Sequence, residues 1–284
     1  MLSDLQISEF ANSFREIAGI SADEPIRNIV KLLESQDYLY SEKSLPKGFA
    51  AESKIENSEF HIAFNSDLKF GEKFHRFTMG HELGHWNIPA HFEILQEQKL
   101  HRSSPEYSSV EEIEREADKF SIYFLAPVVA YRKQMTGKTF SIPTIELLSD
   151  YFNISEYAAV LHFIDSTELS CSLAVCNENF EIEWERRSGR MRDTYKMQQL
   201  KRRRLSDRTM AFECIKQKRS SEVVTSMMSD WYSDFPYKMA CTESVLRLEY
   251  NGKYLSFITP EYSALNEFME NEGIDPDGNY LNNK

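Results

Sequence analysis

The chain has 284 residues, a formal net charge of −12 and 41% hydrophobic residues. This length supports a sizeable hydrophobic core and more than one domain. The negative charge argues against a surface built wholly to bind nucleic acid, and no apolar run reaches the roughly 20 residues that a membrane span requires. The first residues lack a basic stretch followed by an apolar one, so we expect no secretory signal, a cytoplasmic location and no membrane contact.

The first forty residues predict two helices, the second of them with Ile26, Ile29 and Leu33 at helical spacing. Pro46 and Gly48 break this pattern, and residues 54–68 alternate loosely, which favours a short pair of strands. Residues 73–88 form the next predicted helix. The polar segment 89–109 is expected to be a loop with at most one helical turn.

A further helix is predicted from Ser109, its expected N-cap, to Pro127, which ends it. Two short helices, 144–151 and 155–164, follow in a helix-turn-helix outline, and Ser155 is the expected N-cap of the second. This second helix contains no Lys or Arg to meet phosphates, so we favour an ordinary helical hairpin over a DNA-binding element.

From about Leu169 the chain alternates in the manner of strands. The predicted strands are 172–176, 180–186, 244–250 and 253–259, with helical material around 197–217 and a loose tail over the last dozen residues. The fold class is therefore α+β, with three predicted parts. These are a mainly helical domain with a small sheet (1–139), a helix-turn-helix-like segment (140–168) and a C-terminal α+β domain (169–284).

The four cysteines all lie in the C-terminal part and lack the paired spacing of a zinc ribbon. We expect them to be unpaired thiols, buried or inert, in a reducing compartment. Redox sensing by one of them is the minor alternative. They are Cys171, Cys176, Cys214 and Cys241.

The segment "TMGHELGHWN" carries the clearest chemical signal. In a helix, His81 and His85 lie one above the other and can present two imidazoles to one metal ion. Glu82 is turned about 100° from His81, where it can take a proton from a water. Gly80 and Gly84 lower helix propensity, which suggests a close approach by a packing partner or a substrate. Because two histidines on one helix face also occur by chance, a third ligand is needed.

The helix after the predicted loop offers that ligand. Glu114 and Asp118 are four residues apart and share a face, so Glu114 can complete a three-ligand set and Asp118 can accept a hydrogen bond from a ligand histidine. We expect the neighbouring Glu111, Glu112 and Glu116 to be a solvated acidic first turn. The expected metal is Zn²⁺, although Mn²⁺ or Fe²⁺ suits the same ligands.

An enzyme of this kind also needs a donor for the developing oxyanion or for the leaving amine. His91 and His101 lie between the two ligand helices and are candidates, as is Tyr123. The alternative for both histidines is a solvent-exposed position in a loop.

The segments "FHRFTMGHELGHW" and "EREADKFSIYFLAP" resemble the ImmA/IrrE family of metallopeptidases. The resemblance runs from Gly48 to Pro127, with Ser121 and Phe124 replacing the usual alanine and leucine. It implies a zincin-like fold, with His81, His85 and Glu114 as metal ligands and Glu82 as general base. Residues after 140 look like the segment that follows the peptidase domain in longer members, and the C-terminal domain is similar in outline to their accessory domain, which is GAF-like in the radiation-response branch.

Members of this family cleave helix-turn-helix repressors of the Xre type. The resemblance therefore implies a zinc-type endopeptidase that makes one specific cut in such a repressor, in a stress, DNA-damage or mobile-element response. The alternative is a metal-dependent binding module that sequesters a repressor or toxin without cutting it. The retained Glu82 argues for the enzyme, because binding alone needs no general base.

The stretch 186–208 is basic in an otherwise acidic chain. A solvated helix face is one interpretation. The other is a docking site for DNA or an acidic effector, centred on Arg202, Arg203 and Arg204. The sequence leaves the choice open, along with the oligomeric state.

Overall fold

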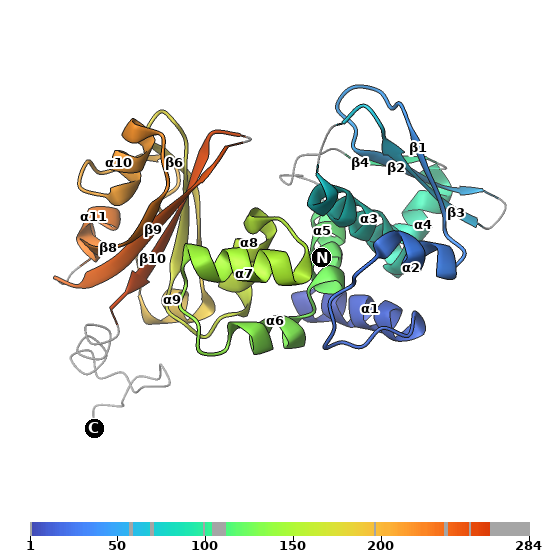
Figure 1. Cartoon of the computed structure of the whole chain (residues 1–284), viewed down its shortest axis with the longest axis horizontal. Helices are drawn as coiled ribbons and strands as arrows, with labels where there is room; N and C mark the ends of the chain where they lie inside the picture. The colour runs from blue at the N-terminus through green and yellow to red at the C-terminus, as the bar shows by residue number, and fades with distance from the viewer. Residues whose placement is uncertain are drawn as a thin grey trace. The chain divides into compact units, whose positions relative to one another are not determined.

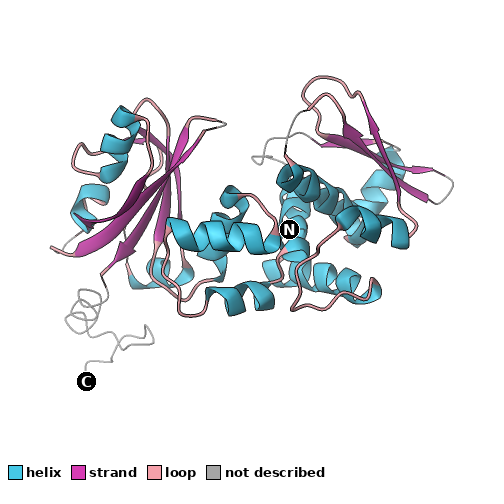
Figure 2. Ribbon diagram, viewed as in Figure 1, coloured by secondary structure: helices cyan, strands magenta, loops and turns pink. Residues whose placement is uncertain are grey.

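The computed structural model describes residues 2–56, 59–68, 71–98, 100–103, 112–195, 197–235, 238–249 and 251–261. The described residues form two compact units, one within Met1–Thr136 and Leu148–Ala159 and the other within Gly137–Leu147 and Val160–Lys284. We call them unit 1 and unit 2. Both combine helices with a sheet, so the predicted α+β class is confirmed (Figures 1 and 2).

Unit 1 contains a four-stranded sheet with the order β1-β3-β2-β4, in which β1 pairs with β3 in parallel and the other neighbours are antiparallel. Helices pack against this sheet (Figure 2). The strands are β1 (Leu39–Lys43), β2 (Ala51–Glu56), β3 (Glu59–Asn65) and β4 (His101–Ser103). The helices are α1 (Asp4–Ile17), α2 (Ile29–Ser35), α3 (Glu72–Asn87), α4 (Pro89–Gln98), α5 (Glu112–Leu125) and α6 (Val128–Met135).

Most of the N-terminal predictions are confirmed, including the two first helices, the strand pair and the two longer helices α3 and α5. The predicted loop over 89–109 is wrong, because its first ten residues form α4. Pro89 is the first residue of α4, where its missing N–H costs no helical hydrogen bond. The strands β1 and β4 were not predicted, and the expected N-cap Ser109 lies outside the described residues.

The predicted helix pair consists of α7 (Ile142–Phe152) and α8 (Glu156–Ser166). Ser155 caps α8, since its Oγ accepts a hydrogen bond from the Ala158 N–H at 3.1 Å. Residues 148–159 belong to unit 1, where Phe152 stacks on Tyr131. The remainder belongs to unit 2, where Phe163 stacks on Phe140. The predicted segment 140–168 is thus shared between the units.

Unit 2 is built on a six-stranded antiparallel sheet with the order β7-β6-β5-β10-β9-β8. Its strands are β5 (Ser172–Cys176), β6 (Glu181–Arg187), β7 (Arg203–Arg204), β8 (Ser221–Met227), β9 (Ala240–Leu248) and β10 (Lys253–Pro260). Its further helices are α9 (Gly189–Thr194), α10 (Met210–Gln217) and α11 (Met228–Trp231). The helix expected around 197–217 is confirmed only over α10, because 203–204 pair with β6 instead.

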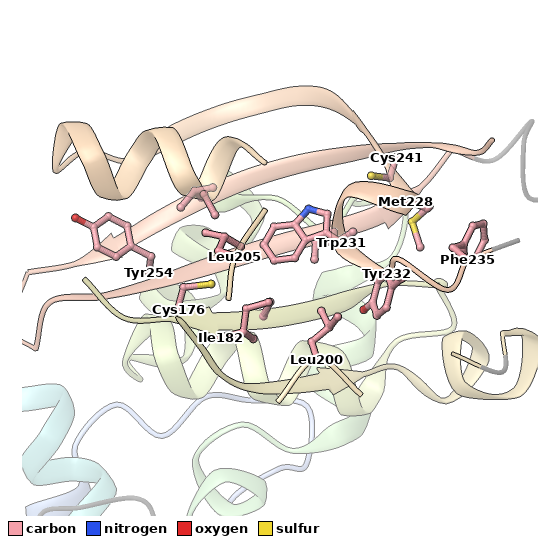
Figure 3. Close-up of a cluster of buried hydrophobic side chains, with 14 of the residues drawn as sticks. Cys176, Ile182, Leu200, Leu205, Met228, Trp231, Tyr232, Phe235, Cys241 and Tyr254 are labelled. Atoms are coloured by element: carbon pink, nitrogen blue, oxygen red, sulfur yellow. The ribbon is translucent and has the colours of Figure 1, made fainter. Parts of the chain in front are cut away.

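The two faces of this sheet are covered differently. On β10, Tyr254 and Ile258 face a cluster of buried residues that includes Trp231 of α11 (Figure 3), and the alternating Phe257 contacts Phe140. The four cysteines are buried and unpaired, as predicted. Burial raises the pKa of Cys171, Cys176 and Cys241 to about 12, which keeps these thiols protonated and inert.

The expected loose tail lies outside the described residues. No helix in the described ranges is long and apolar enough to cross a membrane.

Candidate metal centre

The two helices that carry the motif residues pack closely, and glycines allow it. A Cβ at Gly80 would lie 2.5 Å from Ser121 Oγ, and one at Gly84 would lie 3.1 Å from Ala117 Cα. Both contacts are with α5. The close approach expected from these glycines is therefore made by a packing partner, and it brings the inward faces of α3 and α5 together.

His81, His85 and Glu114 converge between these helices. The Nε2 atoms of His81 and His85 are 3.1 Å apart, and each lies 3.3 Å from one oxygen of Glu114. Two ligand atoms on a tetrahedral zinc with bonds of about 2.0 to 2.1 Å are themselves separated by about 3.3 to 3.4 Å. The spacing of these donors therefore fits a single ion of that size.

Asp118 supports one of the two histidines. Its Oδ1 lies 2.8 Å from Nδ1 of His81, which leaves Nε2 of the ring directed at the donor group. A carboxylate at this position fixes the tautomer and the orientation of a ligand imidazole. Asp118 thus occupies the place that its spacing from Glu114 predicts.

A fourth donor comes from the sheet. His101, the first residue of β4, joins His81, His85 and Glu114 in a group whose ligand atoms all lie within 4.8 Å of one another. His101 Nε2 is 3.3 Å from Glu114 Oε1, and its ring centroid is 4.3 Å from that of His85. This group of three histidines and one glutamate can hold a metal ion.

The charges of the donor group are strongly coupled. Burial disfavours the charged form of His81, but hydrogen bonds to Asp118 and Glu114 outweigh burial and raise its pKa to about 10. Burial lowers the pKa of His85 to about 4. The pKa of Glu114 is lowered despite burial, because His81 and His85 lie beside its carboxylate and favour its ionised form. Without an ion, His81 therefore keeps its proton, whereas His85 is neutral and Glu114 is ionised.

Glu82 lies beside the donor group and is 0% exposed. Its Oε1 accepts a hydrogen bond of 2.6 Å from Ser103 Oγ, whereas its buried Oε2 has no hydrogen-bond partner. Burial raises the pKa of this carboxyl, but the charges of the surrounding histidines, His101 foremost, outweigh burial and lower it. Glu82 is thus an ionised carboxylate with one unused oxygen.

His91 and Glu116 depart from their expected surroundings. Glu116, expected in a solvated turn, is 6% exposed, and its Oε1 accepts a hydrogen bond of 2.6 Å from the Leu2 N–H. Its Oε2 lies 3.0 Å from Nε2 of His91, which belongs to α4 and is 1% exposed. The solvent-exposed alternative is wrong for both His91 and His101, because α4 and β4 fold them inward.

Tyr123 does not share the side of α5 that carries Glu114. The two residues are nine positions apart, which turns them about 180° from each other around the helix. Tyr123 is buried on that other side. Of the three donor candidates, the structure therefore brings only His101 into the ligand group.

The basic stretch lies in unit 2, far along the chain from this centre. Arg202 is exposed in a left-handed conformation (φ 62°), and Arg204 is exposed at the end of β7. Arg203 donates a hydrogen bond to Gln198. Two members of the stretch are neutralised, since Arg187 pairs with Glu185 and Arg186 pairs with Asp165 at 2.7 Å.

Sequence reasoning missed Ser103 entirely and missed His101 as a ligand. Both face inward from β4, whose central Arg102 is exposed. A three-residue strand is too short to show a period-2 pattern. The only indication in the sequence was that His101 and Ser103 can bind a metal or donate a hydrogen bond. Residue type alone does not predict which strand β4 pairs with.

The comparisons with known proteins provide information on fold alone. No family model and no curated protein matches the chain. A solved structure described as a Mycobacterium tuberculosis transcriptional regulator is similar to it, with a TM-score of 0.51 and 10% sequence identity, and the match covers 92% of this chain and 90% of that one. At this identity the likeness shows a shared fold.

Proposed function

We propose that unit 1 is a metal-dependent endopeptidase domain. The observation that carries the proposal is Glu82, a fully buried carboxylate that adjoins a group of metal-ligand side chains and keeps one oxygen without a hydrogen-bond partner. A site that only binds a metal gains nothing from burying an additional charge, which costs free energy unless it is used or paired.

The donor atoms suit Zn²⁺, because imidazole nitrogens and one carboxylate are common zinc ligands. Mn²⁺ and Fe²⁺ accept the same types of donor. A bound divalent ion would supply Lewis acidity, which lowers the pKa of a water towards about 7 and polarises a carbonyl.

The side chains of this protein do the remaining work. Oε2 of Glu82 can take the proton of an attacking water and deliver it to the leaving nitrogen. In the structure described here, Ser103 donates a hydrogen bond to the other oxygen, Oε1, of this carboxylate. Asp118 holds the ring of His81 through Nδ1. Burial of the whole group excludes competing water and strengthens each of these electrostatic contacts.

For the substrate, we propose a helix-turn-helix repressor of the Xre type, cut at one site in a cytoplasmic stress or mobile-element response. This proposal rests on the resemblance of residues 48–127 to the ImmA/IrrE family. The Mycobacterium tuberculosis protein of similar fold is described as a transcriptional regulator, which is compatible with a role in gene control.

The test combines the purified protein with an Xre-type repressor encoded beside it, with Zn²⁺ and with a chelator. We expect two repressor fragments of constant mass in intact-mass spectrometry, and we expect none with the chelator. An intact repressor in the Zn²⁺ sample, with the metal shown to be bound, would contradict the proposal.

A second candidate is a metal-dependent binding module that sequesters a repressor or toxin without cutting it. Four protein donors favour this reading, since closed four-ligand zinc sites are usually structural and catalytic sites keep one position open. The same mixtures distinguish the two. A Zn²⁺-dependent complex that co-elutes from a sizing column, with the repressor intact, indicates a binding module.

A further inference from the structure

His101 differs from the other three donors in the element that carries it. His81, His85 and Glu114 belong to α3 and α5, two helices held in close contact at Gly80 and Gly84. His101 belongs to β4, a three-residue strand at the edge of its sheet, which pairs with β2 alone among the described strands. Short edge strands open at a lower free energy than packed core helices do.

The atoms of His101 and Glu114 are placed to share an ion. His101 Nε2 and Glu114 Oε1 are 3.3 Å apart and both are buried, yet neither has a hydrogen-bond partner. Because these two atoms are close but not hydrogen-bonded to each other, we infer that both are directed at the position of one shared ion. Buried polar atoms without partners are costly, and an ion between them removes that cost.

The same strand also controls the base. His101 and Ser103 are two residues apart, so both side chains point to the inner face of the sheet. His101 reaches the ligand group, and Ser103 donates its hydrogen bond to Oε1 of Glu82. On the outer face, Arg102 contacts Glu52 of β2. Three consecutive residues thus link the metal ligands, the base and the edge of the sheet.

We propose that His101 is a fourth protein ligand that closes the metal site, and that β4 is a displaceable element whose withdrawal from β2 opens it. This inference rests on the proposed metal centre. In the closed state His101 occupies the coordination position that a catalytic site leaves to water. Withdrawal of β4 frees this position and, in the same movement, releases Glu82 from Ser103. The closed state is therefore inactive, and cleavage takes place in the molecules in which β4 is withdrawn.

The test uses the full chain loaded with Co²⁺ and titrated with azide, a small anion that binds only to an open coordination position. The variants are His101→Ala and a matched control, His61→Ala, which removes a histidine from β3 on the other side of β2. A tethered ligand competes with free ones at an effective concentration in the mM range. We therefore expect azide to bind His101→Ala at least about tenfold more tightly than the wild type, with the change followed in the visible spectrum of Co²⁺.

Equal azide affinity in the wild type and in His101→Ala would overturn the proposal. A wild-type protein that takes up no Co²⁺ would instead overturn the metal centre itself, so the two failures are distinct. X-ray absorption of the Zn²⁺-loaded wild type provides a test that needs no variant. Three imidazoles in the coordination shell support the closed site, and two imidazoles contradict it.

Discussion

The two units each bury a glutamate completely, and the two carboxylates have opposite surroundings. Glu243, in β9 of unit 2, is 0% exposed and accepts hydrogen bonds from Ala211 N, Ser226 Oγ and Trp231 Nε1. Glu82, in α3 of unit 1, is equally buried but has one bonded oxygen and one without a partner. Glu243 holds α10, α11 and β8 in place, whereas one carboxylate oxygen of Glu82 remains available to accept a hydrogen bond or a proton.

The pKa shifts separate the two residues in the same way. Burial raises the pKa of Glu243, and its hydrogen bonds oppose burial only in part. Burial acts on Glu82 in the same direction, but the histidines around it prevail and lower its pKa. A buried acid that neutral donors satisfy is a structural element. A buried acid kept ionised by neighbouring imidazoles is typical of a reactive site.

The largest expected effect is the loss of cleavage on substitution of Glu82, and it tests the comparison of the two buried glutamates directly. Glu82→Gln should retain Zn²⁺ but slow repressor cleavage by about 10²- to 10⁴-fold, because an amide cannot act as a base. Glu243→Gln is the matched control. It should keep cleavage and lose about 1–3 kcal/mol of stability, since the new amide group faces the Trp231 N–H. Cleavage assays and urea unfolding measure both, and a Glu82→Gln variant that cuts at the wild-type rate would remove Glu82 from its role.

Asp118→Asn tests whether Asp118 supports metal binding in unit 1. The amide cannot hold the His81 ring in the same tautomer with the same strength, so the affinity for Zn²⁺ should fall by about 10- to 100-fold. Competition with a chromophoric chelator measures the affinity. Asp150→Asn, at an exposed ion pair with Lys73, serves as control and should change nothing. Equal losses in both variants would show that Asp118 has no specific part.

The pH dependence of metal binding tests the charge state of the donor side chains. The pKa of His81 is raised to about 10 and that of His85 is lowered to about 4, so between these values one proton must leave His81 before an ion binds. Rising pH favours that loss. Affinity for Zn²⁺ should increase by about tenfold per pH unit between about pH 6 and about pH 8. Calorimetric titration across this range measures it, and a flat profile contradicts the assignment.

The glycines of α3 provide a test of packing. Gly80→Ala and Gly84→Ala should each destabilise the protein by about 1–3 kcal/mol, because the new methyl group meets the α5 backbone. Gly189→Ala in unit 2, whose Cβ would lie 3.9 Å from its nearest neighbour, is the control. Urea unfolding followed by fluorescence measures the change. Unaltered stability in both α3 variants would mean that the helices separate without cost.

The smallest expected effect concerns the surface of unit 2. Joint charge reversal at Arg202, Arg203 and Arg204 should weaken DNA binding, if this stretch contacts phosphates, and lower the salt slope by about 1 per lost contact. The control reverses exposed charges of the same unit at Lys216, Lys218 and Arg219. Fluorescence anisotropy at several salt concentrations measures both. Unchanged DNA binding and unchanged cleavage exclude a docking role.

Local sequence patterns were sufficient to predict which side chains lie together where those residues are close in the sequence. The spacing of His81 and His85, and of Glu114 and Asp118, follows from the period of an α-helix, and the structure places all four side chains together. Four of the six strands described in unit 2, β5, β6, β9 and β10, were similarly visible in the sequence, whereas β7 and β8 were not predicted. The pairing order of the strands was not visible, because strand order depends on contacts between segments far apart in the chain.

The sequence by itself determined the helix-borne donors, the position of Glu82 beside them and the buried, unpaired state of the cysteines, since each follows from periodicity or residue chemistry. Only the tertiary structure decided what surrounds them. Pairing of β4 with β2 brings His101 and Ser103 to the ligand group, and packing of α4 buries His91 against Glu116. These contacts span 21 to 25 residues or more along the chain, beyond the range over which helical or strand periodicity can specify a neighbour.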